Sequence, residues 1–200
     1  MIKKSAKIYL SGFLVGSLFC FFLIRTFPQV YLSFMGILIR KIESSVELGE
    51  SFHLNISAVI ILNNISASFI MAYGGNLLSR IYLIIGGDVM RAFYLFLYTF
   101  PVLILFFNGF VLGAFLLLYL VFFSESILKY LAALFPHGIF EIPGIILSGA
   151  IGLEIAELGK SDSLSKLKRQ INDVTKGTLR RYAVVIVLLT IGGIMESSKI

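Results

Sequence analysis

The chain has 200 residues, of which 58% are hydrophobic and 14% charged, and its mean hydropathy is +0.96. Soluble domains average about 25% charged residues, so this chain has too few charges to cover its apolar side chains in water. The same composition excludes an intrinsically disordered chain, and the single cysteine, Cys20, excludes a disulfide scaffold. A polytopic membrane protein remains.

Five apolar stretches are long enough to cross a bilayer, whose hydrocarbon core of about 30 Å needs roughly 20 helical residues. They cover about residues 8–24, 55–78, 93–123, 138–156 and 182–195. The first stretch follows three lysines and precedes Arg25 rather than a cleavage site, so we interpret it as an uncleaved anchor. The third is long enough to split near Asn108, which would give six spans. We therefore expect a single all-α membrane domain over residues 1–200, a bundle of transmembrane helices.

The distribution of basic residues predicts the orientation, because cytoplasmic loops are richer in Lys and Arg than the opposite side. With the N-terminus inside, twelve of the 17 Lys and Arg residues fall on the inner side and five on the outer side. We therefore expect a multi-pass protein of the cell membrane with a cytoplasmic N-terminus. The net charge of +6 is then a topology signal and an attraction to anionic lipid of the bilayer. We expect no nucleic-acid partner, because the sequence has no aromatic-plus-basic stripe and no zinc-finger spacing.

Two connecting segments have amphipathic helical patterns. Over residues 31–42, between the first two spans, apolar residues recur at helical spacing with basic residues among them. Over residues 164–174, between the last two spans, apolar residues repeat every three or four positions and basic residues surround them. We expect both segments to form interfacial helices on the membrane surface. The second has the alternative role of docking a cytoplasmic partner.

Pairs of glycines four residues apart occur in the first and third spans, as Gly12-x-x-x-Gly16 and Gly109-x-x-x-Gly113. Such pairs let helix backbones approach closely inside a membrane. The pattern leaves open whether these helices pack within one chain or between chains.

Ionisable and amide side chains inside a bilayer are costly, so each is a candidate functional residue. Counting about 1.5 Å per residue from each helix start places most of them in the outer half of the bundle. We predict that they point inward as one polar cluster, because a side chain facing lipid would lose its hydrogen bonds. Glu141 is expected to approach Asn108 or Glu196. The predicted cluster consists of Asn64, Asn108, His137, Glu141 and Glu196, with Asn63 beside it and Asn76 apart near the inner face.

Three prolines are predicted to disturb the helices around this cluster. Pro101 and Pro143 each leave the carbonyl four residues earlier without its usual partner, and Pro136 fits the first turn of the fourth span. Asn108-Gly109 could open a half-helix. Broken helices at membrane depth are tolerated where they are buried in protein or line a polar cavity.

The polar residues also have a plain structural interpretation and a metal-binding one. Asn and Glu commonly hydrogen-bond neighbouring helices and hold a bundle together without binding a ligand. His137 and Glu141, spaced i, i+4, share a helix face as some metal ligands do. Zinc needs three or four ligands, however, and the only other histidine, His53, lies in a loop. We therefore expect no metal, no other cofactor and no catalytic residue.

Two motifs in the third and fourth spans are specific enough to compare with known families. The first is the run Phe-Pro-His-Gly-Ile-Phe-Glu-Ile-Pro over residues 135–143, with Gly149 and Gly152 after it. The second is Phe-Asn-Gly-Phe-x-x-Gly over residues 107–113, preceded by Asn63-Asn64 and followed at the end by Met195-Glu196. Together these motifs resemble the signature of the stage II sporulation protein M family, whose order and spacing they fit over about residues 55–196.

This resemblance implies a multi-spanning membrane protein of about this length. It supports Asn64, Asn108, His137, Glu141 and Glu196 as the positions that matter, without saying what they do. The founding member of the family, from endospore-forming bacteria, is a membrane component of an engulfment complex that holds cell-wall hydrolases at the septum.

The sequence and the resemblance together predict a non-enzymatic integral membrane scaffold. Its expected partners are other membrane or envelope proteins, or further copies of the chain. The alternative is a transporter or channel-like protein that uses the outer-half polar cluster. A weaker alternative is a metal-dependent membrane hydrolase that uses His137 and Glu141.

Overall fold

The apolar stretches of the sequence form helices, and helices are the only regular elements in the residues that the structure describes, which are 1–51, 55–84, 94–122, 126–158 and 164–197. Within these residues, the computed structural model has five helical stretches that are long and apolar enough to cross a membrane. They are Ile2–Thr26, Ser57–Ser79, Phe96–Val121, Gly138–Glu157 and Lys176–Glu196. Each overlaps a predicted span, so the all-α polytopic fold is confirmed.

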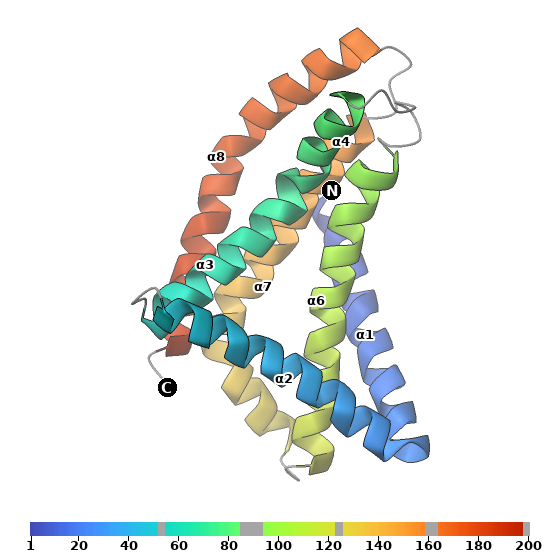
Figure 1. Cartoon of the computed structure of the whole chain (residues 1–200), viewed down its shortest axis with the longest axis vertical. Coiled ribbons are helices and arrows are strands. Elements are labelled where there is room, and N and C mark those ends of the chain that lie inside the picture. The colour runs from blue at the N-terminus through green and yellow to red at the C-terminus, as the bar shows by residue number, and fades with distance from the viewer. Residues whose placement is uncertain (52–54, 85–93, 123–125, 159–163, 198–200) are drawn as a thin grey trace.

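Most elements run along the long axis of the molecule, and one helix crosses the bundle obliquely (Figure 1). Three spans lie within single helices, α1 (Ile2–Thr26), α7 (Ile127–Leu158) and α8 (Leu164–Ser197). The second span combines α3 (Ile56–Phe69), the π-helical segment η1 (Ile70–Gly74) and α4 (Gly75–Ile84). The third combines the π-helical η2 (Tyr94–Tyr98), α6 (Thr99–Leu117) and the π-helical η3 (Leu118–Phe122). The crossing helix is α2 (Pro28–Ser51).

The third span does not split at Asn108. α6 is continuous from Thr99 to Leu117, so the six-span alternative is wrong. The Asn108 side chain donates from Nδ2 to the carbonyl of Ile104, 2.8 Å away and one turn earlier. Because this bond satisfies the amide within its own helix, Asn108-Gly109 continues α6 and does not open a half-helix.

The prolines interrupt the helices less than the sequence predicts. α7 begins at Ile127, eleven residues before the predicted start of the fourth span, and runs through Pro136 and Pro143. Pro136 is therefore the tenth residue of α7, and its predicted place in a first turn is wrong. The preceding residues are mostly Leu and Ala, whose high helix propensity extends α7 upstream. Pro101, by contrast, is the third residue of α6, where the π-helical η2 ends.

The two amphipathic segments, both predicted to be interfacial helices, differ in the structure. α2 is a separate helix, and the apolar side chains of Tyr31 and Met35 are buried against α1 and α6. Burial raises the pKa of the Tyr31 phenol above its usual range, so the hydroxyl stays protonated and donates to the carbonyl of Ala114. The segment 164–174 is not a separate helix but the first part of α8. No proline lies between residues 164 and 197, and Gly177, which follows this segment, costs the helix only about 1 kcal/mol relative to alanine.

The glycine pairs join α1 to α6 within one chain. A Cβ atom at Gly12 would collide with the backbone of Phe106, and one at Gly16 with the backbone of Phe110. From the other side, a Cβ atom at Gly109 would collide with the carbonyl of Tyr9. The two backbones therefore touch directly, which van der Waals packing inside a membrane favours.

The central helix of the bundle is α7. Half of the residues in its span are buried, against one third or less in each of the other four spans. Its residues Ile151 and Ile155 belong to a core cluster that also contains Val185 and Leu189 of α8. Any polar residue on α7 within this core is therefore enclosed by neighbouring helices.

The α1–α6 contact predicts a sharp difference between two glycine substitutions. Gly109→Ala should destabilise the protein by about 1–3 kcal/mol, because the new methyl group forces two backbones apart. Gly177→Ala is the matched control: a Cβ atom there meets nothing within 4 Å, and alanine favours the helix. The buried thiol of Cys20 reports unfolding in detergent through its reaction with a thiol-specific dye. Equal midpoints for the two variants would contradict the close contact.

Candidate functional site

A hydrogen bond between α3 and α7 lies at the centre of the candidate site. The side chain of Asn64 donates from Nδ2 to Oε1 of Glu141 over 2.8 Å, and both side chains are half-buried. α8 approaches the same place at Gly192, where a Cβ atom would collide with Cγ of Glu141. The missing side chain at position 192 therefore provides the room that Glu141 occupies.

A second carboxyl comes from α8. Glu196 lies four residues after Gly192, about one helical turn along the same face, and it interacts electrostatically with Glu141. The structure thus brings Asn64, Glu141 and Glu196 together at one end of the α3–α7–α8 interface. Two carboxyls and an amide donor in such a place can share a proton or hold the three helices together.

The other predicted members are placed differently. Asn108 bonds to Ile104 within α6 and not to Glu141. The backbone of His137 belongs to α7, but its side chain lies outside the described part of the structure. Asn63, next to Asn64, is exposed, so only one of the two adjacent asparagines faces the other helices.

A second polar network, built from hydroxyl groups, lies further along the same three helices. The hydroxyls of Ser68 in α3 and Tyr182 in α8 are 3.0 Å apart, and both lie within hydrogen-bonding distance of the carbonyl of Ile65, at 2.8 and 3.2 Å. Ser148 of α7 donates to the carbonyl of Ser68. All three hydroxyl-bearing residues are buried. Each helix of the interface therefore contributes one group to a network that excludes lipid.

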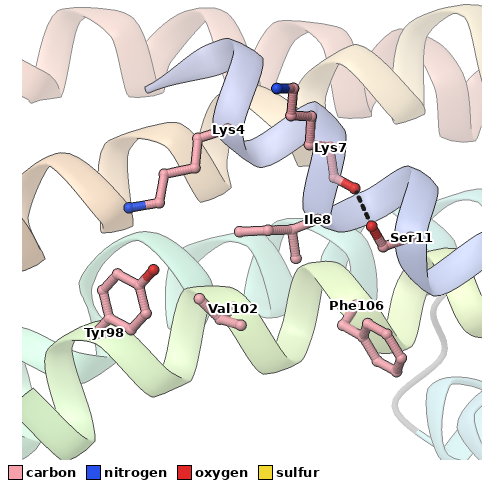
Figure 2. A pocket seen from close by; sticks show the side chains of 7 residues that line it. All are labelled: Lys4, Lys7, Ile8, Ser11, Tyr98, Val102 and Phe106. Carbon is pink, nitrogen blue, oxygen red and sulfur yellow. Dashed lines mark hydrogen bonds between the residues drawn. The ribbon is translucent and has the colours of Figure 1, made fainter.

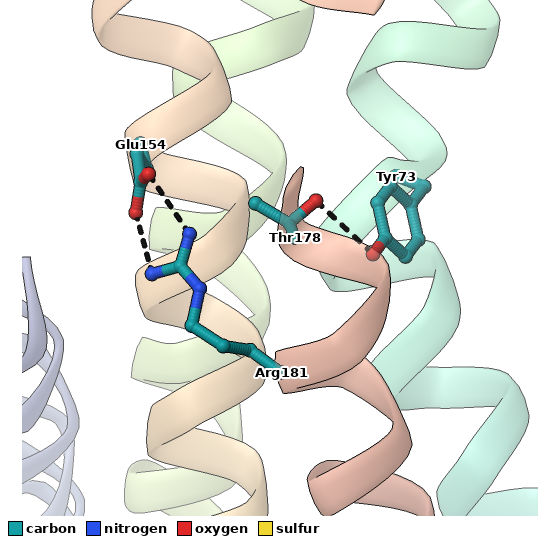
Figure 3. Close-up of polar contacts among 4 residues, drawn as sticks. All are labelled: Tyr73, Glu154, Thr178 and Arg181. Carbon is teal, nitrogen blue, oxygen red and sulfur yellow. Dashed lines mark hydrogen bonds and ion pairs between the residues drawn. The ribbon is translucent and has the colours of Figure 1, made fainter. Parts of the chain in front are cut away.

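The network continues toward the other end of the bundle (Figure 3). Tyr73 in η1 and Thr178 in α8 are joined through their hydroxyls at 3.3 Å. Between Thr178 and Tyr182 on α8, Arg181 forms a bidentate ion pair with Glu154 of α7, at 2.8 and 2.9 Å. This pair is partly exposed, with 45% and 37% of the two side chains accessible, so it contributes less than a buried pair would.

The π-helical segments lie against this network. A Cβ atom at Gly152 of α7 would collide with the carbonyl of Met71 in η1 and lie 2.9 Å from Pro101. A Cβ atom at Gly75 would lie 2.7 Å from the carbonyl of Phe96 in η2. The wide turns of η1 and η2 therefore pack backbone to backbone next to α7, at the depth of the hydroxyl groups.

Sequence reasoning missed the hydroxyl network because it searched for ionisable and amide groups only. Ser, Thr and Tyr occur throughout the helices, and their hydroxyls commonly bond to their own backbone. The available signal was the spacing of Ser148 and Gly152 on one face of α7. That spacing places a small hydroxyl one turn from a glycine, where another helix approaches closely.

The described residues do not favour a metal centre. Within them, no group of three or more His, Cys, Asp or Glu side chains lies close enough to hold a metal ion. The side chains of His53 and His137 are outside this description.

Comparison with known proteins gives one match. The family model described as Stage II sporulation protein M matches residues 9–198, nearly the whole chain. No curated protein and no solved structure matches significantly.

The adjacent asparagines provide a test of the interhelical bond. Asn64→Ala should destabilise the protein by about 1 kcal/mol, because the carboxyl of Glu141 loses its amide donor between the helices. Asn63→Ala, one residue away and exposed, should change stability by less than about 0.5 kcal/mol. Glu141→Gln should retain much of the bond, since an amide oxygen still accepts from Asn64. Unfolding in detergent measures all three variants, and a double-mutant cycle without coupling between residues 64 and 141 would disprove the bond.

Proposed function

The chain belongs to the stage II sporulation protein M family, and from this premise we propose that it acts as a non-enzymatic scaffold in the membrane. In this role it binds other membrane or envelope proteins and holds them in one complex. Five membrane-spanning helices and the family match establish a multi-pass membrane protein, and the scaffold role is the proposal.

The observation that carries the proposal is an apolar stripe on the first third of α7. Ile127, Leu131, Phe135 and Ile139 recur every fourth residue, and between 47% and 65% of each side chain is exposed. Leu128 beside them is 77% exposed. The opposite side of this segment packs on the bundle, where Tyr130 donates to the carbonyl of Leu112 in α6. The stripe is therefore a formed helical surface with one side free.

The stripe is a suitable surface for a partner that is itself in the membrane. α7 has 32 residues and a length of about 48 Å, which exceeds the hydrocarbon core of about 30 Å. Its apolar stripe begins eleven residues before the span Gly138–Glu157, yet Tyr130 contacts Leu112 within the span Phe96–Val121, so part of the stripe lies at membrane depth. Lipid or the apolar surface of another membrane protein can cover side chains there, and we propose that a protein does. A helix of the partner with apolar side chains at every third or fourth position fits this surface.

Site-specific photo-crosslinking tests this surface directly. A benzophenone amino acid at Leu128 or Leu131, in membranes of the native host, should form adducts with a protein. The matched control is Leu18 of α1, which is 69% exposed within a span and should form adducts with lipid only. Protein adducts at Leu18 but not on α7 would exclude the stripe as the partner surface.

We also propose that the N-terminus lies in the cytoplasm. Basic residues are concentrated on that side of the membrane if the chain is oriented in this way. In a Cys20→Ala background, Glu47→Cys on α2 should react with a membrane-impermeant thiol reagent in intact cells. Asp173→Cys on α8 should react only after permeabilisation. Both positions are exposed, so a reversed pattern would reverse the orientation.

A transporter remains the second candidate, because two carboxyls meet an amide at Glu141, Glu196 and Asn64. Reconstitution of the purified protein alone distinguishes the two functions. A scaffold should give no Na⁺ or proton flux above that of protein-free vesicles. Flux that disappears in Glu141→Gln would establish transport and refute the scaffold as the sole function.

A further inference from the structure

A cavity of about 320 Å³ lies between the first turns of α1 and the beginning of α6 (Figure 2). It is remote from the candidate site, because Glu157, which contacts Lys4 at the cavity, is sixteen residues from Glu141 on α7. That separation corresponds to about 24 Å along the helix. The volume is at the lower end of the range for small-molecule sites.

One end of the cavity carries positive charge. Nζ of Lys4 lies 4.9 Å from the centre of the Tyr98 ring and 3.4 Å from Oε1 of Glu157. Figure 2 shows its side chain extended toward Tyr98. Lys7, also in the lining, is exposed and has no ion-pair partner within the described residues. Figure 2 shows the Lys7 side chain turned away from Tyr98, so it reaches the cavity mouth by a change of rotamer. Two lysines and one carboxylate border this end, which therefore has a net positive charge.

The remaining lining is apolar and accessible. Ile8, Val102 and Phe106 line the cavity and are half-buried, so each keeps part of its surface exposed. Tyr98 and Phe106 are eight residues apart, about 12 Å along the helix axis, and Phe106 lies deeper in the span. The hydroxyl of Ser11 already donates to the carbonyl of Lys7 at 2.8 Å. The polarity therefore falls from cationic at the helix ends to apolar toward the middle of the bundle.

We propose that this cavity binds an anionic phospholipid. Its phosphate lies at the cavity mouth beside Lys4, where the exposed Lys7 joins it after a change of rotamer, and the beginning of one acyl chain lies along Ile8, Val102 and Phe106. Lysines at the end of a span attract anionic headgroups, and Glu157 and Tyr98 hold Lys4 in place before the lipid binds. Free phosphate shares the headgroup chemistry but gains nothing from the apolar lining.

Native mass spectrometry of the purified full chain in a neutral detergent tests the proposal. The probes are phosphatidylglycerol, phosphatidylcholine with the same acyl chains, and inorganic phosphate. The wild-type chain should retain phosphatidylglycerol in preference to phosphatidylcholine and should not retain phosphate. Each lysine removed, as Lys4→Gln or Lys7→Gln, should lower this preference about fivefold.

Two controls separate the site from general charge. Lys7→Arg keeps the charge and should keep the preference, and Lys176→Gln removes an exposed lysine of α8 outside the cavity and should not change it. Phe106→Ala should weaken retention of both lipids. The proposal is overturned if Lys176→Gln lowers the preference as much as Lys7→Gln, or if phosphate binds as well as phosphatidylglycerol. Since Lys7 is exposed, its variants should fold, which the Cys20 dye reaction verifies.

Discussion

Inside a membrane no water satisfies a polar side chain, and most of this structure can be understood from that constraint. Asn64 and Glu141 satisfy each other across two helices. Ser68 and Tyr182 do the same a turn further along the bundle. Asn108, which points toward neither group, bonds to a carbonyl of its own helix instead. Because the partners come from α3, α7 and α8, satisfying these groups also fixes how the three helices lie against one another.

The bundle therefore contains two kinds of helix contact. α1 and α6 meet mainly through glycines, backbone against backbone, and the hydroxyl of Ser17 also donates to the carbonyl of Gly113. α3, α7 and α8 meet through hydrogen bonds as well as apolar packing, and Gly192 makes room for the Glu141 side chain. A shape-dependent contact is lost through one added methyl group, whereas a polar contact is lost through one missing donor. Lys4 and Glu157 link the two halves where α1 passes α7.

The fold was largely predictable from the sequence, and the candidate site only in part. The five spans are predictable from the length and low charge of the apolar stretches, because these two properties determine the free energy of transfer into the bilayer. Depth counting placed Asn64, Glu141 and Glu196 in one leaflet, but it carries no information on direction. It therefore grouped them with Asn108, which faces elsewhere. Helix ends were less predictable: α7 and α8 both extend beyond their spans because helix propensity continues where hydropathy falls.

The π-helical η1 adds a constraint on the number of residues, not only on their kind. In an α-helix, the residues three and four positions after Ser68 lie on the same face as Ser68. Tyr73 follows Ser68 by five positions, yet its ring centre lies 5.2 Å from that of Tyr182, which Ser68 also contacts. The wide turn supplies the additional residue. Inserting one further residue between 70 and 74 would rotate α4 by about 100° relative to α3 without removing any of the polar groups. The spacing in this segment is thus part of the information that specifies the fold, and a length change there is expected to be more disruptive than most substitutions.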